Sequence, residues 1–203
     1  MRRLSGVTVL IAVATAMTFG CGFASKALCQ TQAKDPVPKR IVVEEAQAIK
    51  NDNPSFEVKV WTQDNKDSYK PNDTITFHFR ANQDCYIRLL DIAPDQSTTQ
   101  IFPNQFHPDA YVKVEKDKVY TVPTADSRFR FRVSGPSGTE LVKAIGTLDK
   151  PVQALEPFKD QAKQGFVQIP QAELVMKSLR LELKGQDPGN WAESEISFQI
   201  TGH

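Results

Sequence analysis

Apolar and polar residues alternate in a series of short runs across residues 55–201. The clearest run is 128–133, in which Phe129, Phe131 and Val133 alternate with three arginines. Because successive side chains of a β-strand point to opposite faces, such a run is typical of a strand with one buried and one solvated face. Several runs of this kind, separated by Pro, Gly, Asn and Asp, predict an antiparallel β-sandwich or barrel.

The other predicted strands show the same alternation or, at 85–92, an apolar pattern on both faces that favours a central strand. They span residues 56–61, 74–81, 85–92, 98–102, 111–115, 118–122, 140–147, 179–183 and 196–200. The dipeptide Lys116-Asp117 predicts a tight hairpin between two of them. The run Gly135-Pro136-Ser137-Gly138 predicts a turn, because glycine accepts positive φ at little cost.

Two segments carry a helical pattern instead. Within 151–178, apolar residues recur at helical spacing, which predicts one or two short helices in an insertion near the C-terminal end. Residues 41–50 predict a further short helix, with Val42, Ala46 and Ile49 on one side, although a helix of this length is marginal in isolation. The fold class is therefore mainly β.

The first residues read as an export signal. Arg2 and Arg3 precede an uncharged apolar stretch at 7–19, which is short for a bilayer span of about 20 residues. Cys21 follows Gly20, and this ending resembles the lipobox of bacterial lipoproteins, whose cysteine is acylated.

Two other outcomes remain open at this end of the chain. A signal peptidase could cut after Ala24 or Ala27, where small residues surround the cleavage site, or the segment could stay as an uncleaved anchor. With Cys21 as the lipid attachment site, we expect a signal peptide at 1–21, a polar tether with a short helix at 22–54 and a β-sandwich domain at 55–203. A domain of about 150 residues is large enough for one core.

The net charge and the cysteines add little to the predicted location and fold. The formal net charge of +1 favours no nucleic-acid partner. With Cys21 lipidated or removed, Cys29 and Cys85 are the one pair that could form a disulfide, as export would permit. The alternative is that Cys85, which begins an apolar strand, is a small buried residue.

Several short motifs of the chain occur in the same order as in a known protein family. They include Phe56-Glu57-Val58-Lys59-Val60-Trp61, Tyr69-Lys70-Pro71-Asn72-Asp73, Tyr86-Ile87-Arg88-Leu89-Leu90-Asp91, Ile101-Phe102-Pro103-Asn104, Gly135-Pro136-Ser137-Gly138-Thr139-Glu140 and Trp191-Ala192-Glu193. Together they resemble the bacterial domain-of-unknown-function family 4384. The resemblance implies an immunoglobulin-like sandwich, often carried on exported lipoproteins or attached to enzymes as an accessory domain, with no known activity.

The best candidate binding surface is the stripe of Arg128, Arg130 and Arg132, joined by Trp61 as a contact aromatic. Guanidinium groups bind carboxylates and phosphates, but solvated arginines also protect an edge strand from pairing with another molecule.

Catalytic and metal-binding interpretations are weaker. His107 and Asp109, with Asp91 and Asp95, could ligate a metal, but their spacing matches no ligand cluster. Ser137 between glycines lacks the spacing of a nucleophile elbow. We therefore expect no catalytic residues, no metal and no cofactor.

The functional expectation is a non-enzymatic exported protein of the bacterial envelope. It would be a lipoprotein held in the periplasm or at the outer membrane by its lipid, or otherwise a secreted soluble protein. The expected partner is an envelope protein or a polysaccharide. Two alternatives are a domain that senses anionic polysaccharide through the arginine stripe, and a metal-dependent envelope hydrolase acting through the loop of His107 and Asp109.

Overall fold

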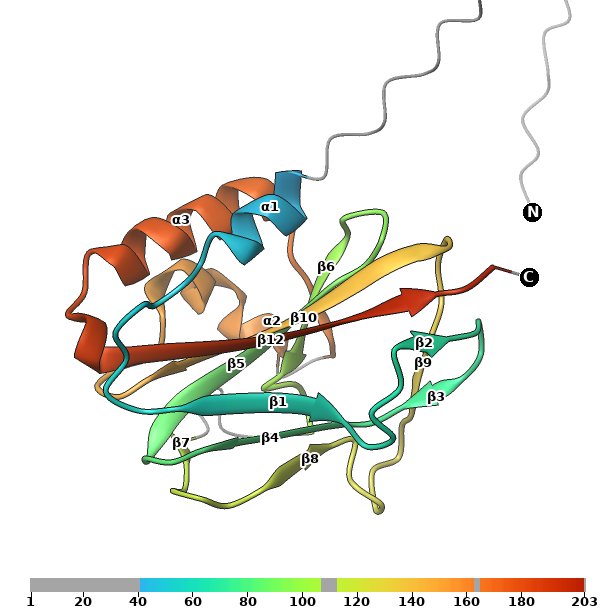
Figure 1. Ribbon diagram of the computed structural model, residues 1–203, viewed down its shortest axis with the longest axis horizontal. Coiled ribbons are helices and arrows are strands. Elements are labelled where there is room, and N and C mark those ends of the chain that lie inside the picture. Colours follow the sequence, from blue (N-terminus) through green and yellow to red (C-terminus); the bar gives the residue numbers. More distant parts are fainter. Residues whose placement is uncertain (1–40, 107–112, 163–164, 203) are drawn as a thin grey trace, which may run out of the picture. The chain divides into compact units, whose positions relative to one another are not determined.

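The computed structural model describes residues 41–106, 113–162 and 165–202, and its largest element is a seven-stranded sheet. The strand order is β11-β6-β5-β10-β12-β2, with β7 also paired to β5 (Figure 1). All neighbours are antiparallel except β12 and β2. The strands are β2 (Ser68–Tyr69), β5 (Cys85–Ile92), β6 (Thr98–Phe102), β7 (Lys113–Val114), β10 (Gly138–Thr147), β11 (Val167–Gln168) and β12 (Trp191–Ile200).

A smaller sheet lies against this one, in the order β1-β4-β8. Its strands are β1 (Val58–Thr62), β4 (Phe77–Ala81) and β8 (Tyr120–Val122), all antiparallel. A separate two-stranded ladder joins β3 (Thr74–Ile75) to β9 (Phe131–Arg132).

The two larger sheets enclose a common apolar core. Phe79 from the smaller sheet is fully buried with Leu89, Phe102 and Val142 from the larger one, and the rings of Phe79 and Phe102 lie 4.7 Å apart. Burial of this apolar surface is the main force that holds the sheets together. The structure thus confirms the prediction of a mainly β protein with a sandwich architecture and a few short helices.

Helices cover the other face of the seven-stranded sheet (Figure 1). A second apolar cluster fills the space between them and includes Leu90 and Ile145 from the sheet and Met176 and Leu179 from a helix. The helices are α1 (Ile41–Gln47), α2 (Lys159–Ala162) and α3 (Ala172–Lys184), with 3-10 turns η1 (Gln153–Phe158) and η2 (Pro188–Asn190).

The predicted helix in 41–50 is present, but it is part of the folded unit. Val43 and Ala46 of α1 are buried, as is Ile49 just beyond it, and Glu45 Oε2 lies 3.1 Å from Arg180 Nε of α3. Residues 41–54 therefore do not belong to a tether, because their apolar side chains complete the cluster beneath the helices.

The predicted strand at 179–183 is wrong. These residues form the second half of α3, in which Leu179 and Leu183 are buried four positions apart and Leu181 is 69% exposed. Leucine alternates here because the helix buries positions i and i+4, and the leucine between them is an exposed apolar residue.

The predicted hairpin at Lys116-Asp117 is also wrong. The strand before it, β7, pairs with β5, whereas the strand after it, β8, pairs with β4. The connection therefore crosses from one sheet of the sandwich to the other. Asp117 has a φ of 59°, and its amide donates to the carbonyl of Ala81 at 2.7 Å.

Candidate binding surfaces

The arginine run forms much less strand than its pattern predicts. Only Phe131–Arg132 is a strand, β9, paired with Thr74 and Ile75. The alternation itself is retained, because Phe129 is partly buried and Val133 is buried, while the arginines are exposed.

Arg130 holds its own loop together. Its guanidinium donates to the backbone carbonyls of Ser127 and Phe129, each at 2.7 Å, and to that of Ala125 at 3.1 Å. These bonds fix the chain in a loop conformation just before β9, and they engage the donors that a ligand would need. Arg128 and Arg132 are also exposed, and among the described residues no hydrogen bond or ion pair engages their guanidinium groups.

Four phenylalanines gather at the apolar side of this run. Phe106 stacks on Phe129 with ring centroids 4.4 Å apart, and Phe166 lies 5.1 Å from Phe129 and 5.2 Å from Phe131. Phe106 is 40% exposed and Phe166 is 36% exposed. We call this group the phenylalanine cluster. Sequence reasoning missed Phe106 and Phe166, because each is an isolated aromatic outside any alternating run.

Trp61 lies elsewhere, on the outward side of β1. Its ring stacks on that of His78 of β4, with centroids 5.6 Å apart and an interplanar angle of 29°. Arg132 belongs to the separate β3–β9 ladder, so Trp61 and the arginine stripe belong to different sheets. Trp191, the other tryptophan, is 3% exposed and packs in the cluster beneath the helices, where it cannot serve as a contact residue.

Two carboxyl groups are placed side by side where β5 and β10 pair. Asp91 lies opposite Val142, and its side chain hydrogen-bonds with that of Glu140 on the same face of the sheet. The Oδ1 atom of Asp91 is buried without a hydrogen-bond partner in the described part of the chain. Desolvation, followed by the charge of Asp91, raises the pKa of Glu140 to about 9, and desolvation raises the pKa of Asp91 to about 6.

Asp91 and Asp95, which the sequence offered as a pair of metal ligands, have different partners in the structure. The Asp95 carboxylate accepts hydrogen bonds from the amide and hydroxyl of Ser97, at 2.9 and 2.7 Å, and these bonds lower its pKa. His107 and Asp109 lie outside the described residues. Among residues 41–106, 113–162 and 165–202, no group of three or more His, Cys, Asp or Glu is arranged to hold a metal.

Of the three cysteines, only Cys85 lies among the described residues. Cys85 is a free thiol, fully buried in the sandwich core, and burial raises its pKa to about 12. A thiol with that pKa is a poor nucleophile, because the reactive thiolate is scarce. Cys21 and Cys29 lie outside the described residues, so the lipid attachment and the disulfide stay predictions. Ser137 is exposed in the turn before β10, as its flanking glycines predict.

Buried charges that no pattern predicted lie on the helix-covered face of the large sheet. The Nζ atom of Lys143, a fully buried residue, lies 2.6 Å from Glu193 Oε2 and 3.0 Å from Glu195 Oε2 of β12. Arg88, 3% exposed, donates to Gln100 Oε1 at 3.0 Å. These groups pair with one another, so they are built into the fold and do not form an open site.

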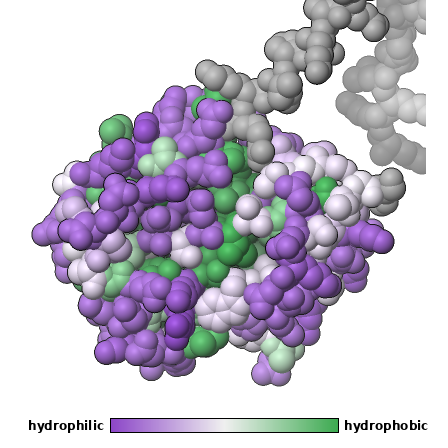
Figure 2. Space-filling model, viewed as in Figure 1, coloured by the Kyte–Doolittle hydropathy of each residue, from purple (hydrophilic) through white to green (hydrophobic). Residues whose placement is uncertain are grey.

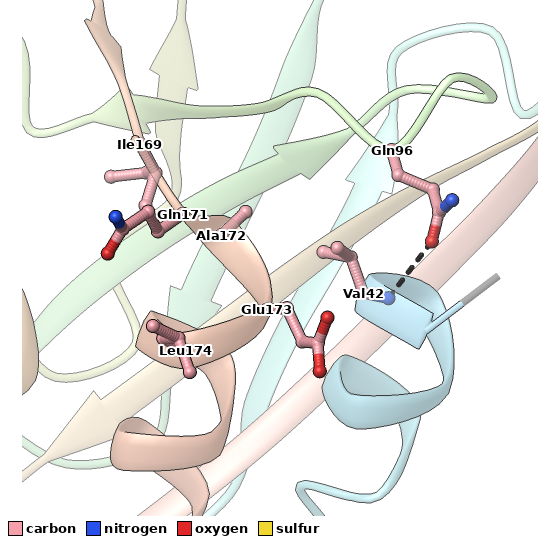
Figure 3. Close-up of a pocket in the computed structure, with 7 residues that line it drawn as sticks. All are labelled: Val42, Gln96, Ile169, Gln171, Ala172, Glu173 and Leu174. Atoms are coloured by element: carbon pink, nitrogen blue, oxygen red, sulfur yellow. Dashed lines mark hydrogen bonds between the residues drawn. The ribbon is translucent and has the colours of Figure 1, made fainter. Parts of the chain in front are cut away.

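A cavity of about 570 Å³ lies where the starts of α1 and α3 meet the turn before β6 (Figure 3). The amide of Val42 donates to Gln96 Oε1 at 3.1 Å across its edge. The ionisable side chain in its lining is Glu173, which lies 2.5 Å from Lys177 Nζ. Among the residues that the structure describes, the lining of the cavity is largely apolar and holds no catalytic pair. Most of the face seen in Figure 2 is hydrophilic, with hydrophobic residues gathered in a narrow central band.

These features define a class of protein: a β-sandwich with one helix-covered face, buried charges that are paired internally, and exposed aromatic groups on its remaining surface. Residues 68–150 match the model of a family described as Domain of unknown function (DUF4384), which supports the resemblance seen in the sequence. The match includes the Phe-Pro-Asn piece at 102–104 and leaves out β1 and β12.

The other comparisons add no relatives. No curated protein and no solved structure matches the chain. In the described part of the chain, no helix is both long enough and apolar enough to cross a membrane.

Proposed function

We propose that the protein is exported to the bacterial cell envelope and acts there by binding a partner protein, without catalysing a reaction. The charged start at Arg2-Arg3, the apolar stretch at 7–19 and the lipobox-like Cys21 support export and lipid anchoring in the periplasm or at the outer membrane. Cleavage after Ala24 or Ala27 would instead give a secreted soluble protein.

The observation that carries the binding role is the phenylalanine cluster. Phe106 and Phe166 are partly exposed, and the exposed Arg128 and Arg132 are adjacent in sequence to the other two phenylalanines of the cluster. Exposed aromatic groups are typical of protein interfaces, and arginine is enriched among the residues that dominate binding there. The complementary partner is a protein surface with apolar side chains and acidic groups.

Site-specific photo-crosslinking tests this role in the native host. A benzophenone side chain at position 106 should give a discrete crosslinked product, whereas one at the exposed Leu174 of α3 should not. Arg132→Glu should weaken the product at position 106, because it reverses an exposed charge next to Phe131 of the cluster, and Lys116→Glu, an exposed cation in another loop, should not. Identical products from positions 106 and 174 would contradict the proposal.

The anchoring part has its own test. The mass of the mature N-terminal peptide from a membrane fraction should show a diacylglyceryl group on Cys21. An unmodified N-terminus at Ser25 or Leu28 would show that the protein is secreted and not lipidated, and it would not affect the proposed binding role. Substrate turnover by the purified protein, lost on a single polar substitution, would contradict the non-enzymatic role.

A further inference from the structure

The outer face of the three-stranded sheet is a solvent-facing surface distinct from the phenylalanine cluster, and the proposed function does not use it. Its inner side chains, such as Val60 and Phe79, are buried in the core. Because side chains alternate along a strand, Lys59, Trp61 and Arg80 point outward, and the sheet lies on the side of the molecule away from the helices (Figure 1). We call this surface the Trp61 face.

The indole of Trp61 is held in a fixed position on this face. Trp61 lies directly opposite His78 in the β1–β4 register, and the two rings stack. The Nδ1 atom of His78 is 2.9 Å from Thr121 Oγ1 of β8, so the imidazole is itself oriented. A ring supported in this way loses little conformational freedom when a ligand packs on it.

Trp61 lines two hollows of the surface. One, of about 290 Å³, is lined by Lys59, Trp61, Arg80 and Val119. Another, of about 230 Å³, is lined in part by Trp61, Asn65, Lys66 and Ser197. Each volume is below the roughly 300–1,000 Å³ of drug-sized ligand sites, which suits no more than a single ring with its substituents. An extended chain of such rings could therefore cross Trp61 from one hollow to the other.

Two positive charges on the Trp61 face repel each other, which destabilises the fold. Lys59 lies directly opposite Arg80 in the register, and like charges in that relation repel. Glu57 Oε1, 3.1 Å from Lys59 Nζ, compensates one of the two. Within the described residues, Arg80 has no ion-pair partner. A carboxylate bound in the first hollow would relieve the repulsion, and a guanidinium can hold it by two parallel hydrogen bonds.

We propose that the Trp61 face binds an acidic polysaccharide, with one carboxylate-bearing sugar ring packed on Trp61 and its carboxylate held by Arg80 and Lys59. The flat C–H face of a sugar ring matches the apolar indole, and the polar groups of the second hollow can bond to the hydroxyls of the next ring. This surface is separate from the phenylalanine cluster, and the inference does not depend on the partner-protein role.

Affinity electrophoresis of the purified protein tests the inference. Gels containing polygalacturonate should retard the protein, whereas gels containing dextran, which lacks carboxylates, or polyglutamate, which lacks sugar rings, should not. Tryptophan fluorescence should change in the same titration, and the change reports Trp61 because the second tryptophan, Trp191, is buried.

Matched variants locate the binding. Arg80→Gln and Trp61→Ala should each weaken the apparent affinity for polygalacturonate by about tenfold or more, the effect of removing one charge-assisted contact or one stacking platform. Lys118→Gln, an exposed cation near β8, and Arg132→Gln, at the phenylalanine cluster, should leave it unchanged. Equal thermal unfolding of Arg80→Gln and the unmodified protein would show that the fold is intact.

Three results would overturn the inference. They are no retardation by polygalacturonate, equal retardation by polyglutamate or dextran, and equal loss of affinity in Lys118→Gln and Arg80→Gln. None of these results bears on the crosslink expected at position 106, so the two proposals fail separately.

Discussion

At the residue scale, the unusual feature is a pair of buried carboxyl groups that interact with each other. Glu140 and Asp91 lie on the core side of the large sheet, where desolvation and their mutual repulsion favour the protonated form of Glu140. The proton lets Glu140 donate a hydrogen bond to Asp91, which stabilises the remaining charge. The pair is therefore favourable when it holds a proton and unfavourable when that proton is lost.

This proton predicts a pH dependence of stability. The pKa values of Glu140 and Asp91 are raised from 4.5 and 3.8 to about 9 and about 6 on folding, so the folded chain binds more protons than the unfolded chain between these limits. The free energy of unfolding should therefore fall as pH rises from about 4 to about 9. Glu140→Gln should stabilise the protein by on the order of 2 kcal/mol at pH 8 and by little at pH 4.

Urea unfolding at pH 4, 6 and 8 measures this difference, because the midpoint shifts with stability. The exposed Glu44→Gln provides the control, and its profile should run parallel to that of the unmodified protein. A Glu140→Gln profile that is also parallel would show that the carboxyl pair does not hold the proton.

At the element scale, α3 shows how one pattern can describe two structures. Leu179, Leu181 and Leu183 alternate as in a strand, yet they also fit a helix that buries the first and last. The neighbouring residues decide in favour of the helix, because the preceding segment supplies the buried Met176 at helical spacing. The core beneath α3 then determines which leucines are buried.

The two interpretations differ in their response to single substitutions. In the helix, Leu183→Ala should lower the free energy of unfolding by about 2–5 kcal/mol, because it leaves a cavity in the cluster beneath α3. Leu181→Ala should change it by less than about 0.5 kcal/mol, because that side chain is 69% exposed. Denaturant unfolding measures both, and a similar loss in the two variants would favour the strand.

At the scale of the whole molecule, the fold has three layers: the small sheet, the large sheet and the helices. The helix layer closes only when α1, from near the N-terminus, packs on α3, from near the C-terminus (Figure 1). Val43, Ala46 and Ile49 contribute to the same apolar cluster as Leu179 and therefore belong to the core.

A substitution in this N-terminal region should therefore destabilise the whole unit. Ile49→Ala should lower the free energy of unfolding by about 2–4 kcal/mol, because Ile49 is 1% exposed in the full chain. Gln47→Ala, an exposed position two residues away, should have little effect. Thermal unfolding of the two variants measures the difference. Equal melting temperatures would show that residues 41–54 act as a tether and are not part of the core.

The sequence predicted the sheets better than the surfaces. Strands 85–92 and 98–102 were predicted at their observed bounds, because their apolar pattern reflects burial directly. The arginine run kept its alternation but lost most of its strand, because Arg130 bonds to three carbonyls of its own loop. Phe106 and Phe166 could not be predicted as neighbours, because they meet only after distant segments pack.

The alternation of apolar and polar residues by itself determined that the protein is mainly β, a sandwich or a barrel of antiparallel strands, because period-2 burial is a local property of each strand. Its resemblance to a family of unknown function was also contained in the sequence. The tertiary structure alone decided that β7 and β8 join different sheets and that Glu140 meets Asp91. It also set Arg80 opposite Lys59 beside Trp61. These relations depend on which strands pair, and strand pairing is set by burial across the whole molecule and not by any single run.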